Sequence, residues 1–136
     1  MTTSSDRPID FVHEHRLRVR YCETDRMGVS HHGSYVAWFE EARTEWLRAL
    51  GQTYRAMEEG GVFLQVVALQ VRYLAPTTYD DLLVVQTRVA ERRRVAITLS
   101  YAVRRATDDI AVAEGTTTLA CVDGMGKLRR LPAILQ

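Results

Sequence analysis

The sequence predicts an α+β fold in which one long helix packs against an antiparallel sheet. Three observations predict it. Apolar residues recur every three or four positions in a single long segment, from Tyr35 to Leu50. Most other segments alternate apolar and polar residues, as half-buried strands do. Short polar turns separate these segments, which favours antiparallel pairing and places the helix on one face of the sheet.

The first half of the chain contains one strand and the long helix. Residues 14–21 alternate and predict a strand, and the polar segment 22–33 predicts a loop. We expect the helix over residues 34–50, with Ser34 as its N-cap and Gly51 as the residue that ends it. A short helical turn over residues 53–59 follows.

The second half of the chain is predicted to consist of strands. Pro76 ends the first of them, because proline has no N–H to donate to a strand ladder. The strongest alternation runs from Val95 to Val103, and Gly115 falls inside a later strand. The expected strands are 62–74, 82–93, 94–105, 110–122 and a short last one at 127–131. Together with the first strand they form a sheet of about five long strands.

Composition indicates an ordinary globular protein. The 136 residues are 46% hydrophobic and 26% charged, so we expect a flexible N-terminal tail at 1–12 and one domain at 13–136. The 18 basic and 17 acidic residues provide no strong field for nucleic acid or anionic membrane. Two distant cysteines, no apolar leader and no apolar run of about 20 residues predict a cytoplasmic protein.

The predicted sheet also has an edge problem. An uncovered edge strand exposes unpaired N–H and C=O groups, and pairing with a second copy of the chain removes them. We therefore expect a homodimer at least, with the sheet continued across it. A tetramer made from two such dimers stays open.

Chemically active side chains gather in the connection YCETDRMGVSHHGSY, residues 21–35. The chain has no G-x-S-x-G motif, glycine-rich phosphate loop or dinucleotide fingerprint. It does place the Asp25 carboxylate a few residues before a helix start, where unpaired N–H groups polarise a carbonyl and hold an oxyanion. A carboxylate contributes about 10²–10⁴-fold as a base, and one oxyanion donor about 10²–10³-fold. Such a site suits a reactive acyl group, and thioesters in particular.

Other residues of this region have more than one interpretation. Glu23 is either a solvated or ion-paired loop residue or a second acid, and we favour the former. Glu40 lies three positions before Arg43, which favours a structural pair on the helix over a catalytic glutamate. His31 and His32 suggest zinc, but the usual ligand spacings are absent, so we expect no metal.

The run from residue 18 to 51 carries a compound motif formed by Tyr21, Glu23, Thr24, Asp25, Gly28, Val29, His31, His32, Ser34, Tyr35, Glu40, Ala42 and Arg43. With these residues it resembles the 4-hydroxybenzoyl-CoA thioesterase-like branch of the hotdog-fold superfamily. It is most similar to bacterial acyl-CoA thioesterases related to the Tol–Pal-associated protein. Ser30 departs from the pattern where relatives often have a β-branched residue, and Ser34 departs where many have Asn.

The resemblance implies a hotdog domain and an acyl-CoA thioesterase that releases a free acid and coenzyme A. It implies that Asp25 is the catalytic carboxylate, as base or nucleophile, and that the backbone N–H of His32 polarises the carbonyl. The other expected residues of the site loop and pocket are Gly28, Val29, His31, Ser34, Tyr35 and Phe63. We expect no cofactor, since coenzyme A is part of the substrate.

A basic tract lies at the predicted turn before residue 95. Arg92, Arg93 and Arg94 are either a solvated hairpin tip or a clamp for coenzyme A phosphates. Two other functions stay open at this point. The chain could be a non-catalytic acyl-CoA-binding hotdog protein or an acyl-carrier-protein thioesterase, for which these arginines together with Arg104 and Arg105 would be a docking face.

Overall fold

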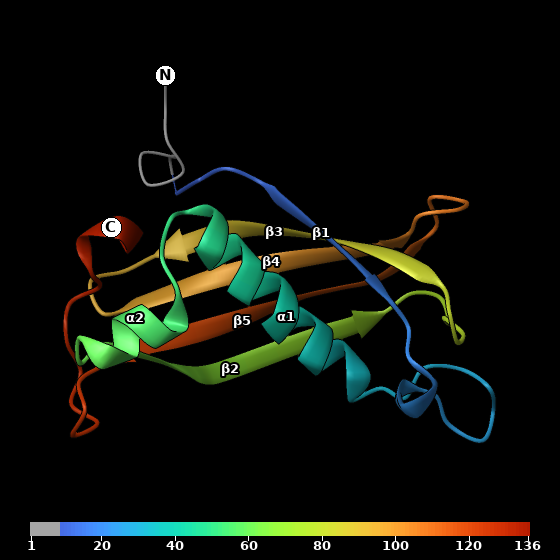
Figure 1. Cartoon of the computed structure of the whole chain (residues 1–136), viewed down its shortest axis with the longest axis horizontal. Coiled ribbons are helices and arrows are strands. Elements are labelled where there is room, and N and C mark those ends of the chain that lie inside the picture. The colour runs from blue at the N-terminus through green and yellow to red at the C-terminus, as the bar shows by residue number, and fades with distance from the viewer. Residues whose placement is uncertain (1–8) are drawn as a thin grey trace.

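A long helix lies across one face of a five-stranded antiparallel sheet in the computed structural model, which describes residues 9–136 (Figure 1). The predicted α+β fold is therefore confirmed. The strands are β1 (His13–Arg18), β2 (Phe63–Tyr73), β3 (Leu82–Arg92), β4 (Ala96–Arg105) and β5 (Ala111–Val122). The helices are α1 (Ser34–Ala49) and α2 (Tyr54–Glu59), with 3₁₀ turns η2 (Tyr21–Glu23) and η3 (Ala133–Leu135).

The strands are arranged in the order β1-β3-β4-β5-β2, and every neighbouring pair is antiparallel. The predicted strand at 127–131 is wrong. Only a single bridge joins Leu128 to Val122. The Asp123 carboxylate accepts the N–H of Lys127 and closes a turn there. The backbone then bonds to Cys121 of β5 and to Arg94 of the β3–β4 connection and does not follow one strand. A strand needs one continuous partner.

The apolar stripe of α1 forms the centre of the core. The predicted stripe residues are all buried: Tyr35, Trp38, Phe39, Ala42, Trp46 and Leu50. Phe39 stacks on Tyr101 of β4 with 4.4 Å between ring centroids. A Cβ on Gly115 of β5 would lie 2.7 Å from the Phe39 ring and 2.4 Å from the Gln70 carbonyl oxygen. Only glycine allows the helix to pack this closely on the sheet.

The two ends of α1 differ in how well the sequence predicts them. Gly51 ends the helix as expected, with φ of 93° and its N–H on the carbonyl of Arg48. Ser34 is not the N-cap, and Gly33 occupies that position. The Ser34 hydroxyl instead donates to the Glu23 carbonyl, 3.0 Å away. The helix start therefore lacks a side-chain cap.

The described chain begins inside the predicted tail. Residues 1–8 of that tail lie outside the described residues. Ile9 and Phe11 are partly buried against the core, so the packed part of the chain begins before the predicted boundary at residue 13. Within residues 9–136, no helix is long and apolar enough to cross a membrane.

Candidate active site

Three connections meet at one end of the sheet (Figure 1). They are the β1–α1 connection at 19–33, the β2–β3 connection at 74–81 and the β4–β5 hairpin at 106–110. The first two are joined by the Ser30 N–H, which donates to the Thr77 carbonyl at 2.8 Å, and by the Val19 N–H, which donates to the Asp81 carbonyl at 3.0 Å. The β1–α1 loop is thus fixed to the sheet.

Asp25 both shapes its loop and keeps a free oxygen. Its N–H donates to the Val29 carbonyl at 2.9 Å, and its carbonyl accepts the Gly28 N–H at 3.0 Å. Gly28 has φ of 80°, which favours glycine at this turn. The carboxylate Oδ1 accepts the Met27 N–H at 2.8 Å. No residue in 9–136 donates to Oδ2, so that oxygen is available to a ligand or water.

The Asp25 side chain lines a cavity of about 420 Å³ beside the start of α1. Its lining residues are Asp25, Ser30, His32, Tyr35, Tyr73, Leu74, Ala75 and Pro76. A larger hollow of about 500 Å³ lies on the opposite face of the sheet, where Arg72 pairs with Glu114. That hollow has no helix terminus beside it. The smaller cavity is therefore the better candidate for acyl chemistry.

The peptide that carries the predicted carbonyl-polarising group is held in place. The Tyr73 hydroxyl donates to the His32 carbonyl at 2.9 Å. The Tyr73 ring meets Tyr35 edge to face, with centroids 5.0 Å apart. Among the described residues, none accepts the His32 N–H. The cavity is thus lined by two residues that each keep a free polar group, the backbone N–H of His32 and one carboxylate oxygen of Asp25.

Tyr35 is a buried neutral residue in the wall of the cavity. Burial raises the pKa of its hydroxyl, although the hydrogen bond to Thr77 opposes that shift. The hydroxyl lies 3.3 Å from Thr77 Oγ1, which in turn donates to Ser30 Oγ at 2.5 Å. Tyr35 therefore stays protonated at neutral pH and fixes the shape of the cavity.

Glu23 has a structural role that the sequence interpretation only partly captured. It is ion-paired, as one interpretation allowed, with Arg20 at 3.3 Å, but its side chain is buried rather than solvated. One carboxylate oxygen accepts the indole N–H of Trp38 at 2.9 Å. The signal was present in the sequence, since a Trp on the buried stripe of a helix needs an acceptor for its N–H.

The predicted Glu40–Arg43 pair is wrong. Arg43 is only 6% exposed and donates to the hydroxyls of Tyr54, at 2.8 Å, and Tyr101, at 3.2 Å. It occupies the same stripe of α1 as the aromatic core residues, whereas Glu40 is exposed. The guanidinium therefore faces the sheet and cannot reach a surface carboxylate.

The two histidines have different surroundings. His31 Nδ1 accepts the Gly33 N–H at 3.0 Å, and the His31 ring packs on His32 with centroids 4.1 Å apart. Within residues 9–136, no group of three or more His, Cys, Asp or Glu side chains is arranged to hold a metal.

Phe63 and the arginine tract lie away from Asp25 in the same chain. β2 begins at the opposite end of the sheet (Figure 1). Its first residue, Phe63, lines a hollow there with Val122 and Gly124. The tract at 92–94 connects β3 to β4 at that same far end. Arg92 donates to the Gln136 carbonyl and Arg93 pairs with Glu91. One chain alone does not bring these residues to the cavity.

The fold agrees with the comparisons to known proteins. Residues 19–135 match the thioesterase-like superfamily, and the chain belongs to that family. It is 37% identical over 114 residues to the acyl-CoA thioesterase YbgC of Haemophilus influenzae, covering 83% of this chain and 82% of that protein. It is 35% identical over 117 residues to the acyl-CoA thioester hydrolase YbgC of Escherichia coli, covering 85% and 87%. The DHNA-CoA thioesterase structure from Staphylococcus aureus is 32% identical, with a TM-score of 0.85 over 88% of this chain and 80% of that chain.

Proposed function

We propose that the protein hydrolyses an acyl-CoA thioester to a free acid and coenzyme A, with Asp25 as the catalytic carboxylate. One observation carries the proposal. Asp25 Oδ2 and the His32 N–H have no partner among the described residues, and both residues line one cavity at the start of α1. The names of the relatives, which include acyl-CoA thioesterases, support the same activity.

The chemistry follows from these two groups. The thioester oxygen accepts the His32 N–H, which polarises the carbonyl and stabilises the oxyanion that forms. Asp25 either takes a proton from a water that adds to the carbonyl carbon or adds to that carbon itself. The intermediate then collapses, the C–S bond breaks, and the thiolate of coenzyme A leaves and takes a proton. If Asp25 adds first, a water hydrolyses the resulting anhydride.

We also propose that the active form is a dimer built through β2. β2 is an edge strand that exposes Val66, Val67 and Leu69, whereas the other edge, β1, is rich in charged residues, which protect an edge from pairing. If β2 pairs with its own copy about its middle, the partner's Phe63 lies opposite Tyr73. Phe63 then reaches the cavity from the second subunit, and the partner's tract at 92–94 lies at the same end, where it can contact coenzyme A phosphates.

The test is Asp25→Asn, assayed for thiol release with short, long and aromatic acyl-CoAs. We expect kcat to fall by about 10²-fold or more with unchanged thermal stability, because Asn keeps an oxygen for the Met27 N–H. Glu45→Gln is the control. Glu45 lies on α1, pairs with Arg48 at 3.3 Å and lines neither the cavity nor the hollow at Phe63, so its variant should keep wild-type activity.

The outcomes separate the alternatives. Wild-type turnover in a folded Asp25→Asn variant would refute the role of Asp25. A wild-type protein that binds an acyl-CoA in calorimetry but releases no thiol would be a non-catalytic binding protein. A carrier-protein thioester hydrolysed far faster than the same acyl-CoA would identify an acyl-carrier-protein thioesterase.

A further inference from the structure

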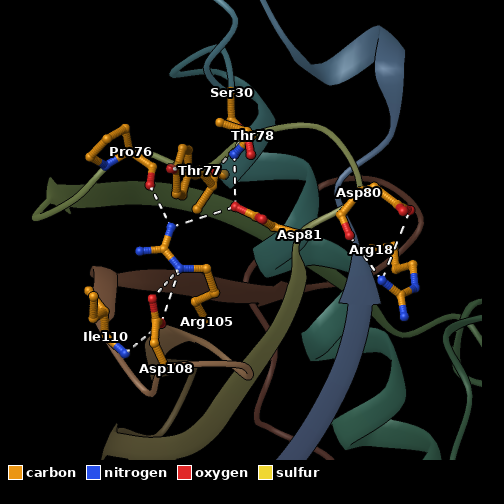
Figure 2. A network of polar contacts seen from close by, with 11 residues as sticks. Arg18, Ser30, Pro76, Thr77, Thr78, Asp80, Asp81, Arg105, Asp108 and Ile110 are labelled. Atoms are coloured by element: carbon orange, nitrogen blue, oxygen red, sulfur yellow. Dashed lines mark hydrogen bonds and ion pairs between the residues drawn. The ribbon is translucent and has the colours of Figure 1, made fainter.

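Arg105, the last residue of β4, connects two of the three segments that meet at the candidate site (Figure 2). Its Nε donates to both carboxylate oxygens of Asp108, at 3.1 and 3.0 Å. Its Nη1 donates to the Pro76 carbonyl at 3.2 Å and lies 3.6 Å from Asp81 Oδ2. The side chain is 20% exposed, so solvent screens these contacts only in part.

The segment that Arg105 holds forms one wall of the cavity. Leu74, Ala75 and Pro76 line it together with Asp25. The next residue, Thr77, is fully buried and holds Ser30 of the Asp25 loop twice: its carbonyl accepts the Ser30 N–H, and its hydroxyl donates to Ser30 Oγ. Any movement of this segment therefore moves both the wall and the loop.

Arg105 holds the segment at two separated points. Pro76 lies near its start and Asp81 near its end, and Asp81 Oδ2 also accepts the Thr78 N–H at 2.9 Å. The segment lies in no helix or strand, and its backbone is also bonded at both ends: the N–H groups of Leu74 and Ala75 donate to the Val112 carbonyl, and Val19 bonds to the backbone of residues 80 and 81. Arg105 adds the side-chain contacts that link these two ends. A planar guanidinium can donate to a carbonyl and interact with two carboxylates at once, in directions fixed by its plane. A lysine ammonium cannot reproduce that geometry.

We propose that Arg105 is a positioning residue for the thioesterase site. It touches none of the reacting groups and acts by fixing the wall 74–76, and through Thr77 and Ser30 the loop that carries Asp25. Its effect on catalysis rests on the proposed function, whereas its effect on the loop does not. A displacement of about 1 Å at a reacting group can cost up to about 10²-fold in rate.

The experiment compares Arg105→Met with Arg104→Met. Arg104 is the preceding residue and pairs with Asp109 at 2.7 Å and with Glu14 at 3.5 Å. Its side chain makes no hydrogen bond or ion pair with residues 74–81. Two quantities are measured well below the unfolding temperature of each variant. They are kcat and KM with the best acyl-CoA substrate, and the hydrogen–deuterium exchange of peptides covering residues 24–33 and 74–81.

We expect Arg105→Met to lower kcat/KM by about 10–100-fold, mainly through kcat, and to speed exchange of the Ser30 amide. Arg105→Lys should restore part of the activity, because it keeps the charge beside Asp81 and Asp108. Arg104→Met should change neither quantity. If Arg105→Met fails to fold, Asp81→Asn gives the same comparison, since it removes the charge that pairs with Arg105 and keeps an acceptor for Thr78.

Several results would overturn the proposal. One is a folded Arg105→Met variant with kcat/KM within twofold of wild type. Another is an equal loss of kcat/KM in Arg104→Met. A wild-type chain that hydrolyses no acyl-CoA would refute the proposed function instead. In that case the hydrogen–deuterium exchange of Arg105→Met and wild type would decide whether Arg105 fixes the loop. Unchanged exchange in Arg105→Met would show that it does not.

Discussion

Two carboxylates only two positions apart, Glu23 and Asp25, have opposite environments. Glu23 is 7% exposed and is fully engaged by Trp38 and Arg20. Asp25 is exposed in the single chain and uses one oxygen for its own turn. A carboxylate that already accepts several hydrogen bonds has little capacity left for a substrate. At the scale of single residues, Glu23 therefore holds the loop on α1, and Asp25 is the group available for chemistry.

Tyr73→Phe tests how the His32 peptide is held. The change removes the hydroxyl that donates to the His32 carbonyl and keeps the ring that packs on Tyr35. One hydrogen bond contributes about 1 kcal/mol net, which corresponds to about fivefold in kcat/KM. Tyr79→Phe is the control, since Tyr79 is also exposed but packs on Tyr21. Equal activity of the two variants would show that the Tyr73 hydroxyl does not position His32.

The sequence named the cavity residues of the β1–α1 loop but not those of the opposite wall. Asp25 was expected from its place before a helix, and His32 and Tyr35 were implied by the family resemblance. Tyr73 and the segment 74–76 were not expected, because they reach the cavity only through the length and pairing of β2. A local sequence pattern does not predict which distant residues a strand brings to the cavity.

At the scale of elements, Gly115 sets how closely α1 approaches the sheet. In Gly115→Ala the new Cβ would lie 2.4 Å from the Gln70 carbonyl, which belongs to backbone and cannot rotate away. We expect a loss of at least about 1–3 kcal/mol of stability, or about 4 °C in Tm for each kcal/mol, in a thermal melt. Gly124→Ala is the control, because its nearest contact is 3.8 Å away. A stable Gly115→Ala protein would show that the helix packs less tightly than described.

Periodicity predicted the long elements well and their connections less well. The stripe of α1 and the alternation of β4 follow directly from which face is buried, so both were found. The end of the chain at 127–131 alternates weakly, and the turn at Asp123 decides its path. Ser34 failed as an N-cap because a residue eleven positions earlier accepts its hydroxyl. A tertiary contact overrode local preference at Ser34, whereas a local turn decided the path of residues 127–131.

At the scale of the whole molecule, the two edges of the sheet differ in chemistry. Of the six residues of β1, HEHRLR, only Leu17 is apolar, whereas β2, FLQVVALQVRY, is mostly apolar. The exposure of β2 makes its apolar character unusual, because most of its residues are exposed in the single chain. An exposed apolar edge strand is an aggregation hazard unless another strand covers it. This contrast favours β2 over β1 as the edge that pairs in the proposed dimer.

Val67→Lys tests that assembly. Val67 is 62% exposed at the middle of β2, so in a β2-paired dimer each lysine would meet its own copy near the twofold axis, where like charges repel. We expect the molar mass from light scattering to fall toward that of one chain, and activity to fall with it, because the partner's Phe63 would leave the cavity. Leu128→Lys changes an equally exposed residue, 64%, away from β2 and should affect neither quantity. A Val67→Lys protein with unchanged mass would place the subunit contact elsewhere, and an active monomer would show that one chain completes the site.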